Sequence, residues 1–164
     1  MQVLYVNSDK ATLEKAWQGK ELGIFLAGPT PRRDDVPSWR PEAVALLKAK
    51  GFTGNVFIPE DMGAERYADY DGQINWEWKG LDAATVQVYW IPRDLQTMPA
   101  FTTNVEFGMY AASGKCVLGY PEGAPKMRYL HALAEKYQMP IAHTLEDTIE
   151  HAMDLLKLAY REAI

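Results

Sequence analysis

The sequence predicts an open α/β fold in which helices cover both faces of a five-stranded, mostly parallel sheet. Short apolar runs alternate with longer amphipathic segments, as in strands joined by crossover helices. The run at 23–27, GIFLA, is continuously apolar and stops at a Gly-Pro pair, which is typical of a buried strand followed by a turn. We therefore expect a flavodoxin-like or Rossmann-like three-layer sandwich. The length of 164 residues favours a single domain over 1–164.

Each expected strand is a short apolar run that ends at a turn residue. The strands are predicted at 23–27, 55–58, 85–91, 116–119 and 141–143. Gly28 follows the first of them, and Pro59 and Pro92 follow the second and third. The run at 2–6 can add an edge strand.

The expected helices lie between these strands and carry recognisable end signals. They are predicted at 41–50, 73–84, 103–113, 126–138 and 145–163. Pro41 suits a first turn, and Gly51 and Gly114 suit C-terminal caps. Thr144 is placed to cap the last helix. The segment 7–21 is ambiguous, with a short helix from Ser8 as one interpretation.

Composition and charge limit the class of partner. Hydrophobic residues make up 48% and charged residues 24% of the chain, as in ordinary globular proteins. The net charge of −5, without a basic block, argues against a nucleic-acid polymer but not against a single nucleotide. No apolar run approaches the ~18 residues of a membrane span, and no signal peptide is evident. Because Cys116 is the single cysteine, we expect a buried thiol and a cytoplasmic protein.

Neither a metal nor a cofactor is expected. His131, His143 and His151 are far apart and lack the spacing of metal ligands, so we interpret them as structural or surface residues. There is no GxGxxG motif and no Walker lysine, which argues against a dinucleotide cofactor and against a P-loop NTPase.

Two long loops, 28–39 and 60–72, follow predicted strands, where ligands bind in open α/β sheets. Gly28 and Pro29 allow close approach of a ligand to the backbone, although a tight turn alone would also explain Gly28. Trp39 and Tyr67 are candidates for stacking on a planar base. Tyr89 and Trp90 are candidates for the same stacking role, but they are equally well explained as core residues.

Glu106 lies in the first turn of the helix predicted after the strand at 85–91, with Thr102 or Thr103 as its N-cap. An acidic residue there can simply complement the helix dipole. However, the residues that follow it, FGMYAA, form an apolar face that would pack on the sheet. We therefore expect Glu106 to be partly desolvated, with a raised pKa that suits site chemistry.

Glu77, between Trp76 and Trp78, is a second candidate carboxylate. It is either a solvated helix residue or the partner of Glu106, because the two helices flank the same predicted strand. Two carboxylates around one anomeric carbon are the recurring arrangement for cleaving glycosidic bonds. One attacks or stabilises the sugar centre and the other manages the proton of the leaving group.

Five segments in order resemble the nucleoside 2-deoxyribosyltransferase family. They are IFLAGP (24–29), QINWE (73–77), YWIP (89–92), TNVEFG (103–108) and GYP (119–121), over roughly residues 23–140. The resemblance implies transfer of 2-deoxyribose between nucleobases through a covalent intermediate on a glutamate, which Glu106 matches. Glu77 falls near the family's first acidic position, where aspartate is usual. The resemblance also implies a homo-oligomer with the site near a subunit interface.

The chain departs from the family at one position. Well-known members have an aspartate that binds the sugar six residues before the nucleophile, and this chain has Ala100 there. Asp94 is the nearest acid and Asn104 is a neighbouring polar candidate for the sugar contact. The sugar contacts therefore differ from those of the family.

Two rival functions remain open beside transfer between free bases. One is a hydrolase that passes the sugar to water and prefers nucleoside 5′-monophosphates, with Arg32, Arg33 and Arg40 available for the phosphate. In that case the arginines bind the phosphate. The alternative interpretation is that they are solvated surface residues. The other is a nucleotide-binding sensor that has lost chemistry, as the missing acid at Ala100 suggests.

Overall fold

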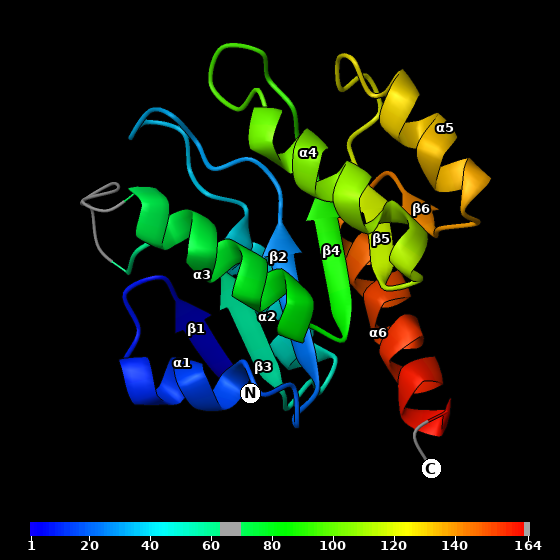
Figure 1. The fold of residues 1–164 in the computed structure, drawn as a ribbon. Helices are drawn as coiled ribbons and strands as arrows, with labels where there is room; N and C mark the ends of the chain where they lie inside the picture. Colours follow the sequence, from blue (N-terminus) through cyan, green and yellow to red (C-terminus); the bar gives the residue numbers. More distant parts are fainter. Residues whose placement is uncertain (63–69, 163–164) are drawn as a thin grey trace.

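A computed structural model describes residues 1–62 and 70–162, and it confirms the three-layer α/β architecture (Figure 1). Within these residues the sheet has six strands instead of the predicted five, in the order β1-β3-β2-β4-β5-β6. Every neighbouring pair is parallel. The additional strand is the N-terminal run, whose residues pair with β3 at the edge of the sheet.

The elements alternate along the chain as predicted. The strands are β1 (Gln2–Tyr5), β2 (Gly23–Ala27), β3 (Asn55–Ile58), β4 (Val86–Trp90), β5 (Cys116–Gly119) and β6 (Ile141–Ala142). The helices are α1 (Lys10–Ala16), α2 (Arg40–Ala49), α3 (Tyr70–Ala83), α4 (Phe101–Tyr110), α5 (Arg128–Lys136) and α6 (Leu145–Glu162). A short 3₁₀ turn, Ala111–Ser113, extends α4. None of the helices in the described part of the chain is long and apolar enough to cross a membrane.

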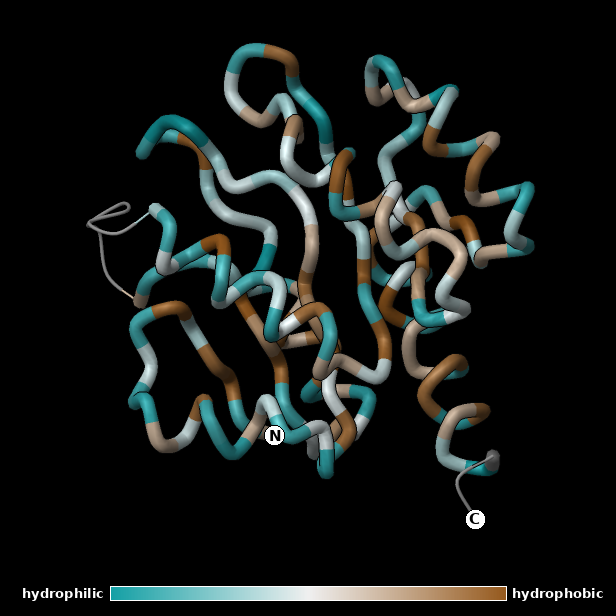
Figure 2. Tube along the Cα trace, in the orientation of Figure 1, coloured by the Kyte–Doolittle hydropathy of each residue, from teal (hydrophilic) through white to brown (hydrophobic). Residues whose placement is uncertain are grey.

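The sheet separates two hydrophobic cores, because successive side chains of a strand point to opposite faces. On β2, Phe25 belongs to the core that also contains residues of α1, α3, α4 and α5, whereas Ile24 and Leu26 belong to the core that contains residues of α2 and α6. Figure 2 shows the central strands as hydrophobic stretches between helices of mixed character. Burial on both faces explains why the strands have continuous apolar sequences.

The expected N-cap is found at α6 but not at α4, and the short helix considered from Ser8 begins at Lys10. Asp9 caps α1 by accepting a hydrogen bond from the Thr12 N–H at 2.9 Å. Thr144 caps α6 through the Asp147 N–H at 3.0 Å, as predicted. The prediction of Thr102 or Thr103 as the N-cap of α4 is wrong, because α4 begins at Phe101 with Ala100 as its N-cap.

The chain leaves the neighbouring strands β2 and β4 in opposite directions across the sheet, from β2 toward β3 and from β4 toward β5. From β2 the chain crosses to β3 on one side, and from β3 it returns to β4 on the other side of β2. In open α/β sheets, the crevice outside the carboxyl ends of two such strands is the usual place for a ligand. The segments after β2 and after β4 therefore flank the expected site.

Candidate active site

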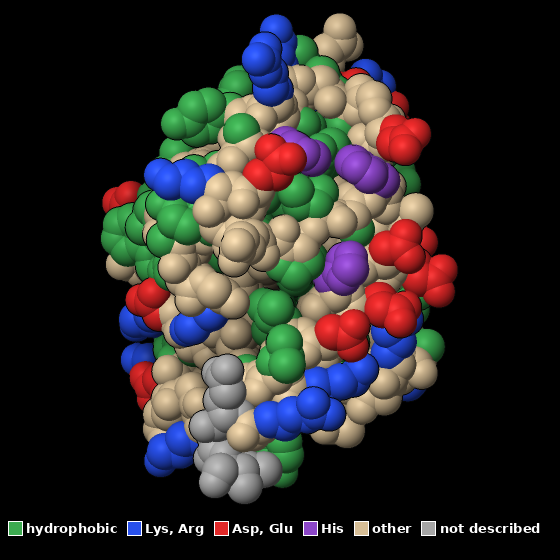
Figure 3. All heavy atoms as spheres, turned by 90° about the vertical axis from the view of Figure 1, so that its right-hand side faces the viewer, with side chains coloured by type: hydrophobic (Ala, Val, Ile, Leu, Met, Phe, Trp, Pro, Cys, Tyr) green, Lys and Arg blue, Asp and Glu red, His purple; other side chains and the backbone are tan. Residues whose placement is uncertain are grey.

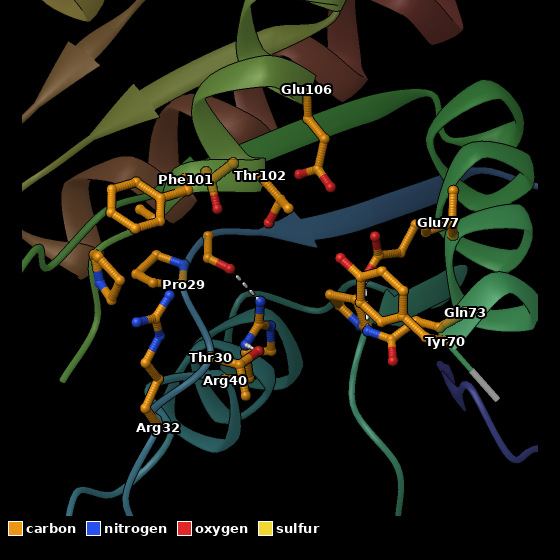
Figure 4. A pocket seen from close by; sticks show the side chains of 16 residues that line it. Pro29, Thr30, Arg32, Arg40, Tyr70, Gln73, Glu77, Phe101, Thr102 and Glu106 are labelled. Atoms are coloured by element: carbon orange, nitrogen blue, oxygen red, sulfur yellow. Dashed lines mark hydrogen bonds between the residues drawn. The ribbon is translucent and has the colours of Figure 1, made fainter. Parts of the chain in front are cut away.

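A cavity of about 230 Å³ lies at this crevice (Figure 4). One wall is the segment after β2, a second is the first two turns of α3, and a third is the start of α4. Pro59, directly after β3, completes it. The cavity matches the placement that the sheet topology predicts.

Glu77 and Glu106 point into this cavity from α3 and α4, with their carboxyl groups turned toward the same part of it (Figure 4). The sequence-based expectation that these two carboxyl groups face one cleft is thus met by the geometry. Gln73, one turn before Glu77, donates a hydrogen bond from Nε2 to Glu77 Oε1 at 2.8 Å. This bond holds the Glu77 side chain along the helix, in the direction of the cavity.

Burial raises the pKa of both carboxyl groups. For Glu106, loss of hydration is the largest cause, and the negative charge of Glu77 raises its pKa further, to about 8. For Glu77, burial raises the pKa, while the hydrogen bond from Gln73 and the charge of Arg40 oppose the increase. Because two neighbouring buried carboxylates cannot both ionise easily, the pair holds one shared proton near neutral pH.

Arg40 supplies the positive charge beside this pair and is itself buried. Its Nη1 lies 2.5 Å from Glu60 Oε1. Its other donors reach backbone oxygens at the end of β2 and just beyond it, with Nε 3.0 Å from Leu26 O and Nη2 2.7 Å from Gly28 O. The guanidinium also lies over the Trp39 ring, 4.8 Å from its centroid. The Arg40 side chain therefore holds the first wall of the cavity in place and also supplies positive electrostatic potential to it.

Gly28 lets the first wall pass close to the end of β4. Its φ is 149°, and a Cβ atom at this position would lie 2.1 Å from Trp90 O. Any larger residue would therefore force the strand and the loop apart. We predicted that a ligand could approach the Gly28 backbone closely, and in the structure it is the β4 backbone that does so. Gly28 also lines the cavity, so a ligand can reach it as well.

The remaining predicted substrate contacts on the first loop divide into two groups. Pro29 and Arg32 line the cavity. Trp39 is buried behind the wall, where its Nε1 donates to Pro29 O at 3.1 Å, so it supports the loop without lining the cavity. Tyr67 lies outside the described residues.

Asp94 and Asn104 do not line the cavity. Asp94 Oδ1 accepts hydrogen bonds from the N–H groups of Gln96 and Thr97, at 3.0 and 2.7 Å, and so shapes the loop after β4. Asn104 Oδ1 accepts a hydrogen bond from Arg93. Both side chains thus organise the segment that carries α4.

Tyr89 and Trp90 belong to the core, which decides between the two interpretations of these aromatics. Tyr89 is 0% exposed and packs edge-on against Phe107, with ring centroids 5.1 Å apart. Trp90 is buried on the opposite face of the sheet, with residues of α2 and α6. Neither ring is available to stack on a base.

Several cavity residues were not singled out for the site by sequence reasoning. They include Thr30, Ile74, Phe101, Thr102 and Thr103. Helical spacing could have identified part of this set, because residues three and four positions apart share a helix face. Thr102 and Thr103 stand in this relation to Glu106, and Ile74 stands in it to Glu77.

The histidines lie away from the cavity. Figure 3 shows histidine side chains together with several carboxylates on the face that carries α5, β6 and α6. His131 Nδ1 is hydrogen-bonded to the Tyr120 hydroxyl, and His143 Nδ1 lies 3.1 Å from Tyr120 O. The described part of the chain contains no group of three or more His, Cys, Asp or Glu side chains that could hold a metal ion.

Comparison with known families identifies the family of the chain. The model of a family described as nucleoside 2-deoxyribosyltransferase like matches residues 21–124, which is more than half of the 164-residue chain. The matched segment runs from β2 through β5 and includes Glu77 and Glu106. No curated protein matches the chain. The chain belongs to the nucleoside 2-deoxyribosyltransferase-like family.

Proposed function

We propose that the protein transfers the 2-deoxyribosyl group between nucleobases by cleaving the N-glycosidic bond of 2′-deoxynucleosides. The observation that carries this proposal is the pair of largely buried glutamates, Glu77 and Glu106, which line one cavity and whose pKa values are both raised by burial. Paired carboxylates with raised pKa values are suited to cleaving a glycosidic bond. Family membership gives independent support.

In the proposed reaction the carboxylate of Glu106 attacks C1′ of the sugar. The C1′–N bond breaks, and its electron pair goes to the base nitrogen. The proton shared by the two glutamates moves through Glu77 to the leaving base, so Glu106 is ionised as it attacks. An acceptor base then returns a proton to Glu77, attacks C1′ and displaces the Glu106 carboxylate. The enzyme ends each cycle with its original proton.

This scheme predicts a bell-shaped dependence of kcat/KM on pH. A raised carboxyl pKa means that the protonated form persists to higher pH, so the pair keeps its proton until pH approaches about 8. Above that value both glutamates are ionised, and we expect kcat/KM to fall about tenfold per pH unit. At acidic pH both become protonated and the rate falls again. Initial rates between pH 4 and 10 test this, and a rate that keeps increasing beyond pH 9 would contradict a shared proton.

The experiment that tests the function itself is base exchange. Purified protein is incubated with each 2′-deoxynucleoside and a different free base, and the products are separated by chromatography. Formation of a new deoxynucleoside supports the transferase. Free base without a new nucleoside would identify a hydrolase instead, and ligand binding with neither product would identify a sensor.

We also propose that the protein is a cytoplasmic homo-oligomer with its site near a subunit interface. Phe101, Val105 and Met109 occupy positions i, i+4 and i+8 of α4 and are 66%, 64% and 59% exposed. This apolar stripe starts at the rim of the cavity, where Phe101 is one of the lining residues. Exposed apolar stripes of this kind favour association. The buried thiol of Cys116 is compatible with a reducing compartment.

The oligomer is testable through the residue of this stripe furthest from the cavity. Met109→Glu places a charge in the contact, and across a symmetric interface it places two like charges together. We expect the variant to elute as a monomer while the wild type does not, measured by size-exclusion chromatography with light scattering. Lys157→Glu, on the exposed surface of α6, is the control. Equal masses for the wild type and Met109→Glu would exclude this stripe as the contact.

A further inference from the structure

The three arginines near the first loop have different environments. Arg33 pairs with Asp35 through two hydrogen bonds, of 2.8 and 2.5 Å, outside the cavity. Arg40 is buried and committed to Glu60 and to backbone carbonyl groups. Arg32 has no carboxylate partner among the described residues, and its guanidinium lies over the Phe101 ring, 5.5 Å from the centroid. It is therefore an uncompensated cation on the cavity wall.

The N-terminus of α4 opens on the same part of the cavity. No side chain caps it, because its N-cap is Ala100. Uncapped N–H groups and the helix dipole favour an anion at this end of a helix. Phe101, Thr102 and Thr103, whose backbone starts the helix, are all cavity residues.

Thr103 is an independent indication of a ligand. The residue is only 2% exposed, yet it lines the cavity, and its hydroxyl has no hydrogen-bond partner in the parts of the chain that the structure describes. The hydroxyl oxygen itself is not fully buried and opens on the cavity. A ligand with acceptor oxygens in the cavity would satisfy the hydroxyl.

We propose that Arg32, Thr103 and the first turn of α4 form a phosphate subsite, and that the preferred substrate is a 2′-deoxynucleoside 5′-monophosphate. Arg32 supplies charge and donors, and the hydroxyl and helix N–H groups supply further donors, which are the usual elements of phosphate recognition. This proposal rests on the proposed function, because the same cavity has to hold the sugar against Glu106.

The spacing along α4 fits one nucleotide. Thr102 and Thr103 precede Glu106 by four and three residues, so their side chains lie roughly 5–6 Å from that of Glu106 on the same helix face. In a nucleoside 5′-monophosphate, the phosphate is joined to the sugar ring through C5′ and O5′, at a similar distance from C1′. A phosphate at the start of α4 therefore places C1′ within reach of the Glu106 carboxylate.

The charge of the cavity is compatible with this assignment. The glutamates share one proton near neutral pH, so together they carry about one negative charge rather than two. The charge of Arg40 is already balanced by its ion pair with Glu60, so Arg32 is the cation that remains for the phosphate.

The first measurement compares kcat/KM for a 2′-deoxynucleoside and its 5′-monophosphate. We expect the monophosphate to be preferred, and Arg32→Ala to lower kcat/KM for the monophosphate by about 10- to 100-fold, the range for a lost charge-assisted contact. The loss for the nucleoside is expected to be clearly smaller than the loss for the monophosphate, because the nucleoside has no phosphate for Arg32 to bind. Thr103→Val, which keeps the shape of the side chain, is expected to act in the same direction. Arg33→Ala is the matched control and should change neither value, because Arg33 is paired outside the cavity.

Equal kcat/KM values for the two wild-type substrates would overturn the subsite. An equal loss for both substrates in Arg32→Ala would also overturn it, because Arg32 would then act on the sugar, the base or the fold.

A binding measurement separates this proposal from the proposed function. A nucleoside 5′-monophosphate, the nucleoside and inorganic phosphate are titrated by calorimetry into Glu106→Gln and into Glu106→Gln/Arg32→Ala. We expect Arg32→Ala to weaken only the ligands that contain phosphate, and inorganic phosphate to compete with the monophosphate but not with the nucleoside. Phosphate-dependent binding without any turnover would support the subsite while refuting the transferase. Binding of inorganic phosphate with no advantage for the monophosphate would overturn the substrate assignment.

Discussion

Glu106→Ala is expected to lose base exchange by at least about 10³-fold while keeping the fold. Removing the nucleophile removes the covalent intermediate, and the remaining groups cannot replace an oxygen placed to attack C1′. Above pH 8 both Glu77 and Glu106 of the wild type are ionised and repel each other. Glu106→Ala removes this repulsion, so we expect the variant to be at least as stable as the wild type in that pH range. Turnover measured by chromatography, with circular dichroism as the check on folding, tests both expectations.

Two further observations separate a nucleophilic role of Glu106 from a general contribution to the site. A covalent deoxyribosyl adduct is expected on Glu106 by mass spectrometry after rapid quenching of the wild type. Formate added to Glu106→Ala is expected to restore part of the base release, because a small carboxylate fits the space left by the side chain. Glu122→Ala, at an exposed loop position, is the control and should behave as wild type. Wild-type rates in Glu106→Ala would remove this residue from the mechanism.

Arg40→Met is expected to lower the free energy of unfolding by about 3–5 kcal/mol. Removing one partner of a buried ion pair leaves the other charge uncompensated, here Glu60, whose side chain is 18% exposed. The variant also leaves the Leu26 and Gly28 carbonyl groups without the donors that the guanidinium supplies. Urea unfolding of the wild type and the variant at the same pH measures the difference.

Arg33→Met is the control for this prediction, because Arg33 pairs with Asp35 where both side chains are 63% exposed. Exposed pairs contribute little, so we expect a change within about 0.5 kcal/mol. Glu60→Gln should fall between the two, since it removes the charge but keeps an acceptor for Arg40. A loss below about 1 kcal/mol in Arg40→Met would show that the pair does not support the first wall of the cavity.

The strands and most helix positions could be predicted from local patterns, because each depends on residues close in sequence. Continuous apolar runs marked β2 to β5, and Thr144 marked the start of α6. The start of α4 could not be found in this way. Its N-cap is Ala100, with a φ of 60°, whereas the neighbouring threonines have the side chains that usually cap helices. The path of the loop after β4, shaped by Asp94, decides where this helix begins.

For the site, local sequence was sufficient to identify the chemistry but not the walls. Glu77 and Glu106 could be singled out because each lies on a helix that flanks the same strand. Their shared proton, and the pKa of about 8 for Glu106, exist only because the fold buries the two carboxyl groups together. Burial and charge coupling act through space and leave no periodic pattern in the chain.

Tertiary contacts also explain why some residues predicted to bind the substrate do not line the cavity. Trp39, Asp94 and Asn104 have the residue types of a binding site, and all three are used within the protein, behind or beside the cavity. The environment of each arginine near the first loop is also not evident from residue type. Arg40 pairs with Glu60, twenty residues away, and Arg33 pairs locally with Asp35, whereas Arg32 has no carboxylate partner among the described residues. Residue type and spacing thus establish the fold class, the family and the two carboxylates, whereas long-range packing decides which side chains are left free to meet a ligand.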